Sequence, residues 1–125
     1  MKNLTLIVVA LVLFIAACRS ITSHRISSIT YIEPNKSFEL GKGKHGAYTA
    51  DVKNAGNTEV EVITETIEGV QTSLGTLKPQ QKNVYFVEKD TKVYFKNMGI
   101  KNATLDLWLK GESGLSMGYQ DTIKK

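Results

Sequence analysis

The sequence is poor in the residues that build disulfides and metal centres. Its 125 residues include one cysteine, two histidines and two prolines. A single cysteine excludes a disulfide within the chain and any cysteine-rich metal site. The histidines, His24 and His45, lie far apart in the sequence and have no third ligand at a motif spacing. We therefore predict no metal site and no cofactor.

Charge of either sign is modest as well. The chain carries 16 basic and 12 acidic side chains, a formal net charge of +4. That excess is too small to indicate a nucleic-acid partner. The GxSxG and HExxH motifs of hydrolases and metalloproteases do not occur. The length accommodates one domain, and we predict that it is not an enzyme.

One long apolar run is present, at the amino terminus. Residues 4–17 contain a single polar side chain, and the only charge before them is Lys2. A helix needs about 20 residues to cross a bilayer, so this run is short for a membrane span. A leading cation, a short apolar stretch and small residues at its end are typical of a secretory signal peptide.

The run ends in Ile15-Ala16-Ala17-Cys18. This segment resembles the lipobox of bacterial lipoproteins, although Leu is more usual than Ile at its first position. The resemblance covers the first 18 residues. It implies that Cys18 receives a diacylglyceryl group, that the chain is cut before it and that its amine is acylated. Two or three acyl chains would anchor a small domain firmly, because each buried methylene contributes about 0.8 kcal/mol.

The residue after the cysteine is Arg19 rather than Asp. In the lipoprotein pattern this implies sorting to the outer membrane, and we expect the protein to face the periplasm. We expect residues 1–17 to be the leader and residues 18–35 the lipidated cysteine with a Ser/Thr-rich tether. Ile26–Ile32 is alternatively a first edge strand. Residues 36–125 are predicted to form the folded domain.

The rest of the chain consists of short β-rich runs separated by turn residues, without sustained helical periodicity. This spacing predicts an all-β fold, a single antiparallel β-sandwich (Ig-like or jelly-roll-like) of about seven to nine strands. The predicted strands are Ser37–Leu40, Ala47–Lys53, Thr58–Ile67, Val70–Leu77, Lys82–Glu88, Thr91–Asn97, Ala103–Lys110 and Gly114–Tyr119.

Alternation within these runs predicts which side chains face the core. Val60 and Val62 should point inward, as should Leu105, Leu107 and Leu109. A tight turn at Lys89-Asp90 would join two strands into a hairpin. Pairing through that turn places four apolar side chains on one buried face: Val84, Phe86, Val93 and Phe95.

The same pairing places aromatic side chains on the outer face. Alternation along Ala103–Lys110 also points Trp108 outward, so that Tyr85, Tyr94 and Trp108 form a candidate binding patch. If this strand pairs with Thr91–Asn97 through a loop at Met98–Asn102, Lys92 lies near Trp108 for a cation–π contact. Such rings could stack on sugar rings or receive the anchor residues of a partner protein. The alternative is a structural role, in which the rings pack beneath a loop or the tether.

The glycine-rich, basic segment Gly41-Lys-Gly-Lys-His-Gly46 is a second candidate. Lys42, Lys44 and His45 could bind an anion together with backbone N–H groups. The segment lacks the spacing of known phosphate-binding loops, and a flexible hairpin loop is the alternative.

These observations lead us to expect an envelope lipoprotein that acts as a non-catalytic binding or structural module. Its partners would be the membrane, through the lipid on Cys18, and an envelope protein or glycan. One alternative is an inhibitor or immunity-type protein that plugs the cleft of an enzyme with residues 41–46. Another is a small hydrolase of envelope glycans, which would need paired carboxylates in a cleft.

Overall fold

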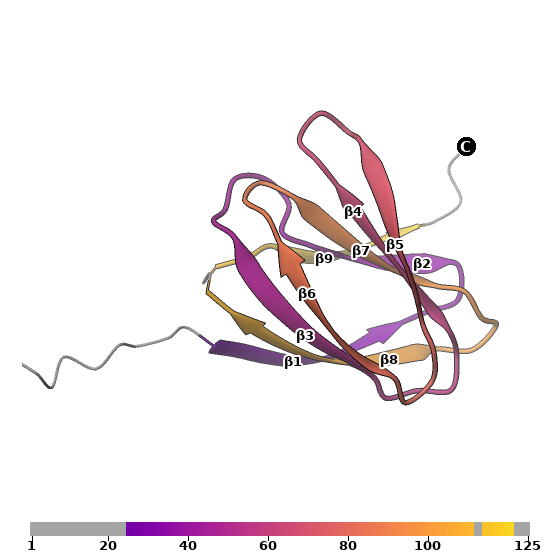
Figure 1. Ribbon diagram of the computed structural model, residues 1–125. Helices are drawn as coiled ribbons and strands as arrows, with labels where there is room; N and C mark the ends of the chain where they lie inside the picture. Colours follow the sequence, from indigo (N-terminus) through magenta and orange to yellow (C-terminus); the bar gives the residue numbers. More distant parts are fainter. Residues whose placement is uncertain (1–24, 112–113, 122–125) are drawn as a thin grey trace, which may run out of the picture.

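The computed structural model describes residues 25–111 and 114–121. They form two antiparallel β-sheets packed face to face (Figure 1). No helix within these ranges is long and apolar enough to cross a bilayer. The predicted leader, Cys18 and the first part of the tether lie outside the described residues.

Nine strands make up the described part of the chain, and this confirms the prediction of an all-β sandwich. Each strand falls on a run predicted from the sequence, the first on the alternative edge strand. In chain order the strands are β1 (Arg25–Ile32), β2 (Lys36–Leu40), β3 (Tyr48–Asn54), β4 (Val60–Glu65), β5 (Gln71–Leu77), β6 (Lys82–Val87), β7 (Lys92–Asn97), β8 (Ala103–Lys110) and β9 (Met117–Asp121).

Consecutive described strands lie in different sheets, except for β4 and β5, which pair with each other. The four-stranded sheet has the order β1-β8-β3-β6, and the five-stranded sheet has the order β5-β4-β7-β2-β9. The first strand lies at an edge and pairs with β8, so that Ile29 is opposite Asp106. The sandwich therefore includes residues from Arg25 onward, ahead of the boundary at residue 36 that the sequence suggested.

Side chains from both sheets fill the space between the layers. The inward positions predicted for β4 and β8 are correct, because Val60, Val62 and the three leucines of β8 are almost fully buried. Alternating burial along these strands is what a half-exposed sheet requires. The largest fully buried side chains are Tyr48, Phe95, Ile32, Leu40, Leu77, Leu105, Leu107 and Leu109.

The predicted hairpin at Lys89-Asp90 is wrong. The two strands exist, but β6 belongs to the four-stranded sheet and β7 to the five-stranded sheet. On β6 the buried face is also the opposite one. Val84 and Phe86 are 58% and 70% exposed, whereas Tyr85 and Val87 point into the core. On β7 the prediction is correct, because Val93 and Phe95 are fully buried.

Contacts with another loop explain why residues 88–91 cross between the sheets. The Asp90 amide donates to the carbonyl oxygen of His45 over 3.1 Å, and Asp90 Oδ1 accepts from the His45 amide over 2.9 Å. Asp90 has a positive φ of 57°. The turn is thus held by the β2–β3 connection, which also passes between sheets, instead of by a cross-strand pair.

Two buried asparagines tie together the loops at one end of the sandwich. Asn54 is the last residue of β3, and its Nδ2 donates to the carbonyl oxygens of Thr58 and Leu77. Asn97 is the last residue of β7, and its Nδ2 donates to the carbonyl oxygens of Ile32 and Lys101. Each Oδ1 accepts from the amide of the glycine two residues later.

Candidate functional site

The outer faces of the two sheets differ in what they expose. On the five-stranded sheet, several polar side chains pair with one another. On the four-stranded sheet, large apolar side chains reach solvent from three of its strands. They are Ile29, Tyr31, Val84, Phe86 and Trp108. A surface that keeps this much apolar area exposed is a candidate for binding.

Trp108 lies at the centre of this outer face. Its neighbours in the register are Ser27 on β1 and Asp51 on β3. Alternation along β8 points Leu107 and Leu109 into the core, which turns the indole outward. The side chain is 40% exposed, so one part of the ring system is seated on the sheet and the rest is open to solvent.

Two open hollows flank the indole. One has a volume of about 470 Å³ and is lined by Ser27, Ser28, Ile29, Asp106, Leu107 and Trp108. The other has a volume of about 400 Å³ and is lined by Arg25, Ile26, Ser27, Asp51, Lys82, Trp108, Leu109 and Lys110. The first hollow offers the Ser27 hydroxyl and the Asp106 carboxylate, while the second gathers three cations around one carboxylate.

The cation that meets Trp108 is Lys82, not Lys92 as predicted. Lys82 Nζ lies 5.5 Å from the centroid of the indole and 3.7 Å from Asp51 Oδ2. Asp51 Oδ1 is shielded from solvent and has no hydrogen-bond partner within the described residues. A donor brought by a ligand would therefore lower the free energy of this carboxylate.

The three predicted aromatic residues do not form one patch. Tyr85 is only 7% exposed and belongs to the core, which corrects its predicted outward orientation. Burial raises the pKa of its hydroxyl. Tyr94 does face outward, but from the five-stranded sheet, on the opposite side of the molecule from Trp108. The prediction failed because β6, β7 and β8 do not pair with one another.

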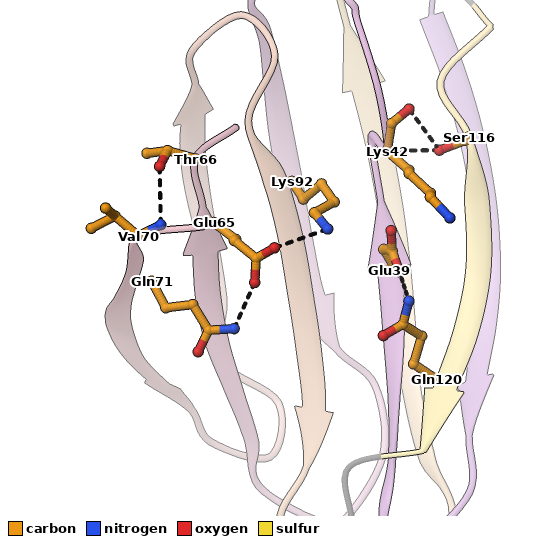
Figure 2. Close-up of polar contacts among 9 residues, drawn as sticks. All are labelled: Glu39, Lys42, Glu65, Thr66, Val70, Gln71, Lys92, Ser116 and Gln120. Atoms are coloured by element: carbon orange, nitrogen blue, oxygen red, sulfur yellow. Dashed lines mark hydrogen bonds and ion pairs between the residues drawn. The ribbon is translucent and has the colours of Figure 1, made fainter. Parts of the chain in front are cut away.

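Lys92 belongs to the outer face of the five-stranded sheet (Figure 2). Its Nζ lies 2.9 Å from Glu65 Oε1 and 5.5 Å from the centroid of the Tyr94 ring. Gln71 donates to the other carboxylate oxygen of Glu65 over 2.6 Å. The bond with Glu65 raises the pKa of Lys92. Two hydrogen bonds lower the pKa of Glu65, and the bond from Gln71 has a larger effect than the bond from Lys92.

The basic loop between β2 and β3 connects the two sheets and is not a hairpin. The amides of Gly41 and Lys42 donate to the carbonyl and the hydroxyl of Ser116, and the His45 amide donates to Asp90. These three N–H groups are therefore engaged within the protein. The ring nitrogens of His45 contact the carbonyl oxygens of Gly46 and Thr91. Lys42 and Lys44 remain exposed.

Sequence reasoning missed the polar residues around Trp108, namely Ser27, Asp51 and Lys82. Each of them lies at an outward-facing position of its own strand, and the alternating pattern of the sequence indicates those positions. What the sequence did not show was the strand order, and only the order places β1, β3 and β6 beside β8.

Within residues 25–111 and 114–121, no group of three or more His, Cys, Asp or Glu side chains could hold a metal ion. Cys18, the predicted lipidation site, lies outside these ranges.

No protein-family model and no curated protein sequence matches this chain.

Proposed function

We propose that the chain is a lipid-anchored protein of a bacterial cell envelope that binds an acidic saccharide without catalysis. The leader and the Ile15–Cys18 segment support the anchor. The observation that carries the binding role is the half-open indole of Trp108, which lines two hollows that each combine apolar surface with polar side chains.

The combination of an apolar floor with polar side chains in the two hollows suits a saccharide, which has apolar C–H faces and polar hydroxyls. An exposed indole offers a flat face on which the C–H side of a sugar ring can stack. Ser27 and Asp106 supply a hydroxyl and a carboxylate that bond sugar hydroxyls. On the other side, Arg25, Lys82 and Lys110 gather around a single carboxylate. That excess of positive charge favours a ligand that carries a carboxylate of its own.

The positions of the acidic side chains support binding without hydrolysis. A glycosidase holds a pair of carboxylates on either side of the scissile bond, about 5–10 Å apart. Asp106 and Asp51 are diagonal neighbours in the register of β8 and β3, a spacing of about 7–8 Å, but they line different hollows, so neither hollow is flanked by both carboxylates. Lys82 also lies beside Asp51, so this carboxylate is engaged in an ion pair.

Fluorescence titration tests this proposal, because Trp108 is the single tryptophan of the chain. The probe is a disaccharide of N-acetylglucosamine and N-acetylmuramic acid, with neutral chitobiose for comparison. We expect the acidic disaccharide to bind more tightly than the neutral one. Because Trp108→Ala removes the fluorophore, calorimetry measures its affinity, which should fall about tenfold through the loss of roughly 1.5 kcal/mol of stacking.

Tyr94→Ala is the matched control. Tyr94 also faces outward and also has a lysine Nζ 5.5 Å from its ring, but it lies on the other sheet. Its loss should leave the affinity unchanged. Equal effects of both substitutions, or no binding of either sugar, would contradict the proposed site. Mass spectrometry of the disaccharide after incubation should show it intact, and cleavage would favour the hydrolase.

A further inference from the structure

β6 forms a free edge of the four-stranded sheet. Within the described residues it pairs with β3 alone, through the register Thr49 with Phe86 and Asp51 with Val84. The Val84 amide donates over 2.9 Å to Oδ1 of its neighbour Asn83. This N–H therefore points away from β3, toward the side on which a further strand would lie.

This edge lacks the features that normally keep strands apart. Edge strands are usually protected by proline, bulges, charged side chains in mid-strand or a covering loop. β6 reads Lys-Asn-Val-Tyr-Phe-Val and carries its only charge at its first residue. By contrast, β5 at the edge of the other sheet is distorted by a bulge opposite Glu61 and Ile63, and Gly75 within it has a φ of 99°.

Exposed apolar side chains accompany the free edge. Val84 and Phe86 stand on the outer face and are among the most exposed large apolar residues of the described chain. Tyr85 and Val87 on the opposite face are seated in the core, which holds the strand straight. A flat edge with protruding apolar side chains is a template for strand addition.

We propose that two copies of this chain pair through their β6 strands, antiparallel about a two-fold axis at Tyr85. In this register Val84 lies opposite Phe86 of the second copy, and Tyr85 lies opposite its own counterpart. Lys82 lies opposite Glu88, so the interface ends in an ion pair on each side. Such an interface is self-complementary, as two-fold symmetry demands.

Neighbouring registers are less favourable. A shift of two residues in one direction places Phe86 opposite Lys82, and in the other direction Val84 opposite Glu88. A shift of one residue sets the outer face of one copy beside the core face of the other. The proposed register also makes Val84 and Phe86 a hydrogen-bonded pair, in agreement with the outward direction of the Val84 amide.

Pairing would join two four-stranded sheets into one, with both Trp108 side chains on the same outer face. Addition of one strand buries less area than a stable interface between freely diffusing proteins requires. The proposed membrane anchor compensates for this, because it confines the copies to a surface and raises their effective concentration. The pairing itself does not depend on the ligand of the proposed site.

Disulfide trapping tests the register in the full-length protein in membranes. Copies with Val84→Cys and copies with Phe86→Cys are expressed together and oxidised. A cross-strand pair about 5.5 Å apart at Cα suits a disulfide. We expect at least fivefold more cross-linked dimer from the mixture than from either variant alone, since identical positions are displaced along the strands. Equal cross-linking in all three samples would overturn the register.

Charge reversal tests the interface without cysteines. In vesicles that carry the full-length chain, energy transfer between fluorescently labelled copies measures pairing, and Glu88→Lys should raise the dimer dissociation constant at least tenfold, because two lysines then face each other twice. The double variant Lys82→Glu with Glu88→Lys should restore the dimer. Glu68→Lys, an equal change on the exposed β4–β5 turn, is the control and should have no effect. A wild-type chain that stays monomeric in these vesicles, or a dimer that is insensitive to Glu88→Lys, would refute the pairing.

Discussion

At the scale of single residues, Asn54 and Asn97 show how short polar side chains organise a β-sandwich. Both end a strand, both donate twice to carbonyl oxygens of neighbouring loops, and both accept from a glycine amide two positions later. A Cβ at Gly99 would collide with Thr58 Oγ1. The recurring sequence Asn-x-Gly after a strand is the pattern that would have predicted this arrangement.

We expect Asn97→Ala to destabilise the protein by about 2–4 kcal/mol. The substitution leaves the carbonyl oxygens of Ile32 and Lys101 without their donor in a buried place, and each such loss costs about 1–3 kcal/mol. Urea unfolding measures the change. Asn57→Ala, at an exposed position, is the control and should shift the midpoint little. Equal midpoints for the two variants would contradict a bridging role for Asn97.

Glu65 gives a prediction about pH. Its pKa is lowered in the folded state by Gln71 and Lys92, so its ionised form stabilises the fold. This contribution is present above the ordinary carboxyl pKa of about 4.3 and is lost as the pH falls through the lowered value. The cost of Glu65→Gln in unfolding free energy should be about 1 kcal/mol or less at pH 7.

That cost should shrink toward zero as the pH approaches 2. The control is Glu59→Gln, because Glu59 is exposed. The comparison requires unfolding curves of wild type and both variants at several pH values. A cost of Glu65→Gln that stays constant from pH 7 to pH 2 would show that the carboxylate charge contributes nothing.

At the scale of strands, alternation identified which runs would form strands but not how they pair. It worked for β8, where leucines alternate with polar or amphipathic side chains, and for β4, where valines alternate with glutamates. It failed for β6, because Val84 and Phe86 are as apolar as Tyr85 and Val87. With both faces apolar, the buried face is decided by the neighbouring sheet, which local sequence does not specify. The candidate site around Trp108 was missed because the sequence does not show which strands lie beside β8.

Two phenylalanines on consecutive strands test this assignment of faces. Phe95 is fully buried on β7, and Phe86 is 70% exposed on β6. Phe95→Ala should cost about 3–5 kcal/mol through the lost burial and the cavity left behind. Phe86→Ala should cost less than about 0.5 kcal/mol when unfolding is measured at concentrations that keep the chain monomeric. Comparable costs would mean that the buried face of β6 has been assigned wrongly.

At the scale of the whole molecule, seven of the eight connections between the nine described strands pass from one sheet to the other. Among these strands, β4 and β5 alone are consecutive in the chain and lie in the same sheet. Each layer is thus assembled from strands distant in the sequence, and β1 pairs with β8. This organisation is why composition and spacing predicted a sandwich whereas the location of the Trp108 site required the complete topology.

The positions of the first and last strands have a mechanical consequence. β1 starts beside Lys110, while β9 ends beside Lys36 at the opposite end of the sandwich (Figure 1). Tension applied between Arg25 and Asp121 would therefore run parallel to the strands. Their hydrogen bonds would be loaded together in shear rather than peeled apart one after another, so the domain would transmit force along its long axis as a stiff link.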